Sequence, residues 1–374
     1  MPIKYNPFFT ITPEMAQQLI AIESNKQTIE NAPITVKTLA HLRETARLKT
    51  IHYSTQIEGN RLSQEEVKKV LIQQKNFPGR ERDEQEVRGY YAALKYLNQC
   101  STNNKPLTEK TIQTLHALVM AHGRTRVKPS PYRTSQNVIR ESLSRTIVYL
   151  PPEAHDVEPL MHALVTWIHK NKKRIPCPLL AGIAHYQFVT IHPYFDGNGK
   201  TARLLTTLIL HQGGYGLKGM YSLEEYYAKN LGDYYQALSI GPSHNYYFGR
   251  AEADITPWLS YFCAGMYASF EAVKREALLA AHRGEPDQTP LLRTLDPRQR
   301  KALELFVEFE TITAQQIGQL LGLGARSASA LCQKWVNQSF LTIIDPSRKA
   351  RRYGLAQKFK RILEQTNLQS ATQF

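Results

Sequence analysis

Cysteine is scarce and scattered in this sequence of 374 residues. The chain has four cysteines, none of them in Cys-x-x-Cys spacing: Cys100, Cys177, Cys263 and Cys332. Such usage is typical of a reducing cytoplasm and speaks against a disulfide framework or a structural zinc site. Runs of about 18 apolar residues are also missing, as is an N-terminal signal of charged and then apolar residues. We therefore expect a soluble, cytoplasmic protein.

Acidic residues are too few to balance the basic ones. The sequence has 47 Lys and Arg against 32 Asp and Glu, a formal net charge of +15 at pH 7. Residues 291–374 alone hold 13 basic and 6 acidic side chains. This excess indicates an anionic partner, whether a nucleotide, a nucleic acid or an acidic protein. An apolar fraction of 42% in 374 residues is enough for two globular domains.

The densest set of functional groups lies between residues 192 and 203. This loop reads His-Pro-Tyr-Phe-Asp-Gly-Asn-Gly-Lys-Thr-Ala-Arg, between an apolar segment and an apolar helical pattern. Its two glycines let the backbone approach a ligand closely, and the following helix offers unpaired N–H groups and a positive dipole end. Lys200 and Arg203, one turn apart, complete a pocket for polyphosphate. Asp196 is placed to bind a divalent cation among those phosphates, and His192 to act as a base.

Two other interpretations of this loop are weaker. A nucleotide-binding P-loop needs a glycine five residues before Gly199, whereas position 194 is tyrosine and the preceding segment has a helical pattern. A plain polar loop between helices would explain a single histidine. It does not explain five functional groups gathered around Gly-x-Gly.

The loop resembles the signature of Fic-domain proteins, His-Pro-Phe-x-(Asp/Glu)-Gly-Asn-Gly-(Lys/Arg)-x-x-Arg, with Tyr194 in place of the usual phenylalanine. Members of that family usually transfer AMP from ATP to a hydroxyl side chain of a protein. The resemblance implies that a Ser, Thr or Tyr hydroxyl attacks the α-phosphate, that His192 takes its proton and that Asp196 holds Mg²⁺. It also implies which residues bind the nucleotide: Asp196, Gly197, Asn198, Gly199, Lys200, Thr201 and Arg203.

A second motif ends an expected helix over residues 36–57, where Ser54 and Glu58 share one face and Gly59 is placed to stop the helix. Glutamate is disfavoured at the negative end of a helix dipole, which indicates a cationic partner elsewhere. The motif Ser-x-x-x-Glu-Gly resembles the inhibitory motif of Fic proteins. The resemblance implies that Glu58 pairs with Arg203 and so prevents ATP from binding in its reactive pose.

Helical patterns fill most of the chain on either side of the loop. We expect helices over residues 13–30, 36–57, 63–74, 84–98, 108–121, 157–170, 178–191, 200–212 and 255–276, and another after residue 222. Between residues 123 and 150 the helical period stops, and residues 132–136 and 146–150 predict a short β-hairpin. In the Fic family a hairpin here is a flap that aligns the target segment. By resemblance, four flap residues also border the nucleotide: Thr146, Ile147, Val148 and Tyr149.

Tyr234 and Tyr235 belong to an Asp-Tyr-Tyr-x-x-Leu sequence on a further expected helix. Most tyrosines on helices are packing residues whose hydroxyl reaches the surface. In Fic proteins the corresponding pair flanks the adenine, and the resemblance assigns that role to both tyrosines here.

The last 84 residues read as a separate domain that follows a linker of polar residues, glycine and proline at 281–290. Residues 297–308, 313–320 and 325–337 predict three short helices, and residues 341–344 and 351–355 a hairpin. This order resembles a winged helix, used either for DNA or for protein contacts with a solvated basic face. In the first case the recognition helix and wing would present these residues to DNA: Arg326, Ser327, Ser329, Lys334, Arg348, Lys349, Arg351 and Arg352.

The combined patterns predict a mainly α protein with a Fic-type all-helical core, a small β-hairpin flap and a C-terminal winged-helix domain. The expected domains are a helical region with the inhibitory helix (1–110), the catalytic core (111–280) and the winged helix (291–374). The expected function is AMP transfer to a hydroxyl of a target protein or of the chain itself, and the resemblance favours a homodimer. Two alternatives stay open: removal of AMP by the same site, and a DNA-binding regulator with the core as nucleotide sensor.

Overall fold

The computed structural model describes residues 4–360, apart from residues 33, 35, 141–145, 242, 282–290, 292–293 and 348–350. The chain forms two compact units, each made from two stretches of sequence. The first unit comprises Met1–Gln27 and Thr45–Val273, and the second comprises Thr28–Glu44 and Lys274–Phe374. Within the second unit, an ion pair between Arg43 and Glu304 connects the N-terminal stretch to the C-terminal one.

These units cut across the first expected domain, since residues 28–44 group with the C-terminal part of the chain. The domain boundaries at 110, 280 and 290 stay predictions. Most of the expected linker, residues 282–290, lies outside the described residues.

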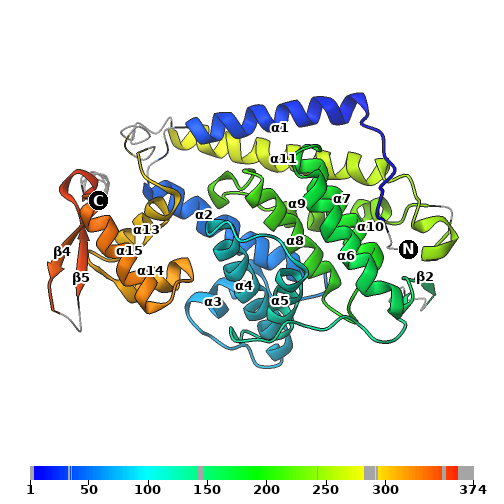
Figure 1. Cartoon of the computed structure of the whole chain (residues 1–374), viewed down its shortest axis with the longest axis horizontal. Coiled ribbons are helices and arrows are strands. Elements are labelled where there is room, and N and C mark those ends of the chain that lie inside the picture. Colours follow the sequence, from blue (N-terminus) through cyan, green and yellow to red (C-terminus); the bar gives the residue numbers. More distant parts are fainter. Residues whose placement is uncertain are drawn as a thin grey trace. The chain divides into compact units, whose positions relative to one another are not determined.

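Five helices are described in the N-terminal part of the chain (Figure 1), and three of them begin at a capping side chain. They are α1 (Pro13–Asn31), α2 (Val36–Gln56), α3 (Gln64–Ile72), α4 (Glu81–Thr102) and α5 (Glu109–Met120). The Thr12 hydroxyl accepts a backbone hydrogen bond at the start of α1, and Ser63 and Glu66 form a reciprocal capping box at α3. Although the start of α5 has no acid at the third position, Thr108 and Thr111 make the same reciprocal pair through their hydroxyls.

The centre of the first unit is helical and apolar. Its middle helices are α6 (Ala154–Asn171), α7 (Cys177–Ile191) and α8 (Asn198–Gln212). Nearly every residue of α7 is buried, and α7 packs against both α6 and α8, as expected for a helix that is apolar on all sides. The unit continues with the short turn η1 (Leu217–Gly219), α9 (Leu223–Lys229), α10 (Leu231–Leu238), the π-turn η2 (Tyr246–Arg250) and α11 (Thr256–Ala281). In Figure 1, α1 runs beside α11, and Asn25 donates a hydrogen bond to Glu271 at 2.8 Å.

Strands β1 (Ile139–Arg140) and β2 (Ile147–Tyr149) pair in antiparallel orientation and form a small hairpin. The second strand lies where the sequence pattern places it, whereas the expected first strand, residues 132–136, is irregular. That expectation is wrong because Arg133 is held elsewhere. Its backbone N–H donates to Pro193 O at 2.9 Å, and its guanidinium donates to the carbonyls of His192 and Pro152.

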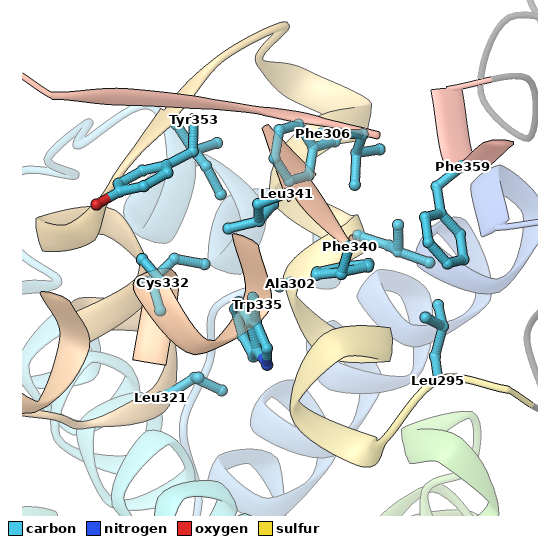
Figure 2. Packing of buried hydrophobic residues seen from close by; sticks show 14 residues of the cluster. Leu295, Ala302, Phe306, Leu321, Cys332, Trp335, Phe340, Leu341, Tyr353 and Phe359 are labelled. Carbon is cyan, nitrogen blue, oxygen red and sulfur yellow. The ribbon is translucent and has the colours of Figure 1, made fainter. Parts of the chain in front are cut away.

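The described C-terminal part of the second unit combines helices with a three-stranded antiparallel sheet of order β3-β5-β4. Along the chain these elements are α13 (Pro297–Glu308), β3 (Ile312–Thr313), α14 (Ala314–Leu321), α15 (Ala325–Asn337), β4 (Leu341–Asp345) and β5 (Arg352–Leu355). Strand β3 was not expected, because two residues are too short to show an alternating pattern. Figure 2 shows the core of this unit, where Trp335 packs edge to face with Phe340 at 5.4 Å between ring centroids.

The described part of the chain is therefore mainly helical, with short strands in the flap hairpin and the C-terminal sheet, as the sequence predicts. None of the helices described is long and apolar enough to cross a membrane.

Candidate functional site

The signature loop joins the end of α7 to the start of α8. Helix α7 ends because His192 adopts a left-handed backbone conformation (φ 50°, ψ 60°) that is uncommon for a residue other than glycine. Gly197 (φ 74°) then precedes α8, and a Cβ added there would lie 3.0 Å from the Met120 sulfur. Strained backbone of this kind persists where surrounding contacts hold it, and it is concentrated at functional sites.

Two residues outside the loop hold it in shape. The Arg133 Nε–H donates to the His192 carbonyl at 2.9 Å. His116 Nε2 lies 2.9 Å from the Asp196 carbonyl, and its ring stacks on Tyr194 with centroids 3.6 Å apart. Sequence reasoning assigned no site role to either residue, because nothing local signals a contact made 59 or 80 positions away along the chain.

The loop also uses two of the expected nucleotide-binding side chains to fix its own shape. The Asn198 amide accepts the Tyr194 N–H at 3.0 Å and donates to the Tyr194 carbonyl at 2.7 Å. The Thr201 hydroxyl donates to the Gly197 carbonyl at 2.8 Å. Both side chains are buried, so their direct contact with a nucleotide stays a prediction.

His192 has the protonation state that a base requires. Burial lowers its pKa to about 4, so the imidazole is neutral at pH 7. Its Nδ1 lies 3.3 Å from the Val189 carbonyl, which favours the tautomer that carries the proton on Nδ1. The lone pair of Nε2 is then available to accept a proton from a substrate hydroxyl.

Arg203 brings the signature loop and the second motif together. Its side chain is 1% exposed, with Nε–H donating to the Ser54 hydroxyl at 2.8 Å and Nη2 to the Ser54 carbonyl at 2.8 Å. The same Nη2 lies 3.0 Å from Glu58 Oε1. The carboxylate also packs on Gly199, where an added Cβ would collide with it. Burial opposes the charge of Arg203, but Glu58 and two nearby tyrosines raise its pKa overall.

Gly59, the third member of this motif, ends the turn after α2. Its φ of 90° suits glycine, and its N–H donates to the Gln56 carbonyl at 2.9 Å.

Lys200 and Asp196 differ in their surroundings. The Lys200 amine is nearly buried, 3.9 Å from the Glu86 carboxylate. Asp196 is exposed, and its Oδ1 accepts the Gly197 N–H at 2.6 Å. Within the described ranges no three His, Cys, Asp or Glu side chains form a metal-binding group. A magnesium ion at Asp196 would therefore take most of its ligands from substrate phosphates and water, which is its common mode of binding.

The two tyrosines expected at the adenine have different environments. Tyr234 is 2% exposed, bonded through its hydroxyl to His185 Nε2 at 3.0 Å and stacked on Tyr227 at 4.9 Å. Its neighbours cover the ring here, and its contact with adenine stays a prediction. Tyr235 is 48% exposed, and its hydroxyl donates to the Ile57 carbonyl at 3.4 Å, so it keeps a ring surface available to a ligand.

The flap residues divide in the same way. Thr146, Ile147 and Val148 are exposed, and their contact with a nucleotide stays a prediction. Tyr149 is buried, and its hydroxyl donates to the Thr190 carbonyl at 2.6 Å. It anchors the flap to α7, and its place beside the nucleotide stays a prediction.

The basic residues of the second unit lie mostly at its surface. Two of them, Arg326 and Lys334, are exposed on α15, as are the polar Ser327 and Ser329. Arg351 is partly buried, and the exposed Arg352 donates to the Thr311 hydroxyl at 3.1 Å. Arg348 and Lys349 lie outside the described residues.

Comparison with known proteins identifies the class to which this site belongs. Residues 106–210, which span α5 to α8, match the model of the Fic/DOC family. Curated relatives carry the name protein adenylyltransferase Fic. The Culex quinquefasciatus protein is 33% identical over 184 residues, covering 47% of this chain and 34% of the relative. The Aedes aegypti protein is 29% identical over 197 residues, covering 52% and 38%. The chain thus spans well under half the length of these relatives.

Solved structures agree on the fold. A Fic family protein from Desulfovibrio desulfuricans G20 aligns with 94% of this chain and 99% of its own, with a TM-score of 0.58 and 24% identity. A Fic domain containing signaling protein from Bacteroides thetaiotaomicron VPI-5482 aligns with 72% and 100%, with a TM-score of 0.60 and 21% identity. At these identities the likeness shows the fold.

Proposed function

We propose that this protein transfers AMP from ATP to a hydroxyl side chain of a target protein. The observation that carries the proposal is the glycine-rich turn at the start of α8. A neutral histidine, His192, lies before this turn, and a deeply buried cation, Arg203, lies after it. A helix N-terminus and a cation suit the phosphates of ATP, and a neutral imidazole at the rim suits a hydroxyl nucleophile. The names of the curated relatives support the same activity.

In the proposed reaction a Ser, Thr or Tyr hydroxyl attacks the α-phosphate of ATP in line with the leaving group. His192 Nε2 takes the hydroxyl proton, the new O–P bond forms, and pyrophosphate leaves. Lys200 and Arg203 neutralise charge on the β- and γ-phosphates. Asp196 would hold Mg²⁺, which supplies further neutralisation of the phosphates when bound. The exposed flap would align the target segment by pairing with β2.

We also propose that the structure represents an inhibited state. Glu58 Oε1 accepts a hydrogen bond from the Arg203 guanidinium, which the γ-phosphate requires, and it packs against Gly199 at the start of α8. A carboxylate in this position excludes a phosphate by charge as well as by volume. ATP can then take its reactive pose after Glu58 has moved away.

Labelled ATP tests both proposals. Purified protein is mixed with ATP labelled at the α-phosphate and Mg²⁺, alone and with a cell lysate. We expect weak self-labelling by the wild type, about tenfold more by Glu58→Gly and none by His192→Ala. His162→Ala, which removes an exposed histidine of α6, is the matched control and should label like the wild type. An absence of label in Glu58→Gly, on itself and on lysate proteins, would contradict the transferase.

The same site supports a second candidate, removal of AMP from a modified protein. Glu58 lies close enough to His192 to act on its pKa, so its carboxylate could orient a water against the AMP phosphorus. To separate AMP removal from AMP transfer, a protein is first labelled by the Glu58→Gly variant. The release of labelled AMP from it is then measured with the wild type and with a Glu58→Gln variant. Faster release by the wild type than by Glu58→Gln would favour this candidate.

We propose further that the second unit is a winged helix that contacts DNA. Its order of elements and the exposed basic side chains of α15 support this. Replacing Arg326 and Lys334 together by glutamate should weaken duplex binding and reduce its salt dependence by about two counterions. The matched control is Lys170→Glu on α6 of the first unit, which should leave binding unchanged. Equal binding by all three proteins would contradict DNA contact through α15.

A further inference from the structure

Arg203 is buried more deeply than the acid that neutralises it. The arginine side chain is 1% exposed, whereas that of Glu58 is 27% exposed. The proposed active state requires Glu58 to leave Arg203. A buried guanidinium without any counter-charge is strongly unfavourable, so a negative charge that stays near this residue would stabilise the open site before the γ-phosphate of ATP arrives.

A second carboxylate, that of Glu224, is buried in the first unit. Glu224, in the first turn of α9, is 2% exposed. It accepts a hydrogen bond from the Ser222 hydroxyl at 3.0 Å and one from the Tyr90 hydroxyl at 3.5 Å. The positive end of the α9 dipole favours a carboxylate at this position. No role in AMP transfer has been assigned to it so far.

Two buried hydroxyl side chains, those of Ser54 and Tyr90, lie along the path from Arg203 to this carboxylate. The Arg203 Nε–H donates to the Ser54 hydroxyl at 2.8 Å. Ser54 lies near enough to Tyr90 to lower the pKa of its hydroxyl, and the Tyr90 hydroxyl donates to Glu224 at 3.5 Å. Arg203, Ser54, Tyr90 and Glu224 are all buried. Each donor can therefore point from the cation towards the carboxylate, an arrangement in which successive hydrogen bonds polarise and strengthen one another.

We propose that Glu224 is a positioning residue for Arg203: it is the permanent counter-charge that acts through Tyr90 and Ser54, while Glu58 is the exchangeable one. When Glu58 leaves, the relay keeps the guanidinium charged and in place for the γ-phosphate. The inference rests on the proposed ATP site and deepens it. It also requires an ionised Glu224. Burial raises the pKa of this carboxyl, and Ser222, Arg203 and Thr50 act in the opposite direction.

An isosteric amide tests the charge directly. In a Glu58→Gly background, Glu224→Gln preserves the shape of the side chain and removes its charge. The matched control is Glu225→Gln, because the neighbouring Glu225 pairs with Lys49 at 3.0 Å and Lys229 at 2.7 Å instead of with the relay. Calorimetry measures the Kd of ADP and of an ATP analogue with a methylene bridge between the α- and β-phosphates.

We expect Glu224→Gln to weaken the ATP analogue about tenfold and ADP less than about twofold, since ADP lacks the phosphate that Arg203 would hold. Glu225→Gln should leave both Kd values within about twofold. An unchanged Kd would mean that Glu224 is uncharged or unimportant. Equal weakening of ADP and the analogue, or an equal effect of Glu225→Gln, would also overturn the proposal.

Tyr90→Phe provides a second test that leaves every charge in place. It removes the middle hydroxyl of the relay, and we expect it to weaken the ATP analogue about threefold in the same background. If Glu224→Gln does not fold, this variant decides, and an unchanged Kd refutes the relay. Both tests measure binding, so they stand apart from the transferase proposal: a protein that binds ATP through the relay but transfers no label would contradict that proposal alone.

Discussion

Gly199→Ala is a substitution whose effect should depend on a residue 141 positions earlier in the sequence. Gly199 lies in the first turn of α8 with ordinary helical backbone, so alanine causes no backbone strain there. Its Cβ, however, would collide with Glu58 Oε1 and lie 3.2 Å from Arg203 Nη1. The methyl group therefore displaces the Glu58 carboxylate from Arg203.

The magnitude follows from the burial of the two partners. Exposed ion pairs contribute about 0–1 kcal/mol, and breaking a fully buried one costs about 3–5 kcal/mol. The pair here joins a buried arginine to a glutamate that is 27% exposed, and Ser54 continues to bind the arginine. We therefore expect Gly199→Ala to lower the free energy of unfolding by about 2 kcal/mol in the wild type. In a Glu58→Gly background the cost should fall below about 0.5 kcal/mol, because alanine favours the helix and the collision is gone.

Urea unfolding of the four proteins in this cycle, followed by circular dichroism, gives the coupling between the two positions. Hydrogen exchange of the last turn of α2 gives an independent measure, and Gly199→Ala should accelerate it when Glu58 is present. Equal destabilisation in both backgrounds, with unchanged exchange in α2, would refute the contact between Glu58 and Gly199.

Three further predictions concern the chemistry and support of the loop. The pKa of His192 is about 4, and Glu58 raises it, so AMP transfer by Glu58→Gly should be flat down to about pH 5 and fall only at or below about pH 4; a midpoint near pH 6.5 would contradict the desolvated, neutral imidazole. Arg133→Ala removes hydrogen bonds to the carbonyls of His192, Ser135 and Pro152 and should cost about 3 kcal/mol in urea unfolding, against less than about 0.5 kcal/mol for Arg124→Ala at a solvent-exposed position. Asp196→Asn should raise the Mg²⁺ concentration for half-maximal transfer about tenfold, and an unchanged requirement would remove Asp196 as the ligand.

Local patterns were sufficient for the elements that carry the site. An apolar run predicted α7, Gly-x-Gly predicted the turn into α8, and serine at position 63 predicted the capping box of α3. These features depend on residues within a few positions of one another. The first strand of the hairpin was misplaced because Arg133 is held by carbonyls 59 and 19 positions away, which no local alternation of side chains records.

Burial explains the other differences. Tyr234 and Tyr235 are adjacent in sequence, yet one is 2% and the other 48% exposed, since the neighbouring helix face covers only the first. Tyr149 and Val148 differ in the same way on β2. His116, Tyr90 and Glu224 had no motif to distinguish them, and their contacts with the site come from helices that meet in space.

The sequence by itself determined the chemical inventory of this protein: a histidine, an acid, two glycines and two cations in one loop, and a glutamate at the end of a helix far upstream. Chemistry of this kind depends on residue type and close spacing, and both can be read from a linear chain. Only the tertiary structure decided the electrostatic state of that inventory. It desolvated His192 and so lowered its pKa to about 4, and it set Glu58 3.0 Å from Arg203 across 145 residues. Desolvation and charge pairing arise from the packing of distant helices, and so they exist only in the folded chain.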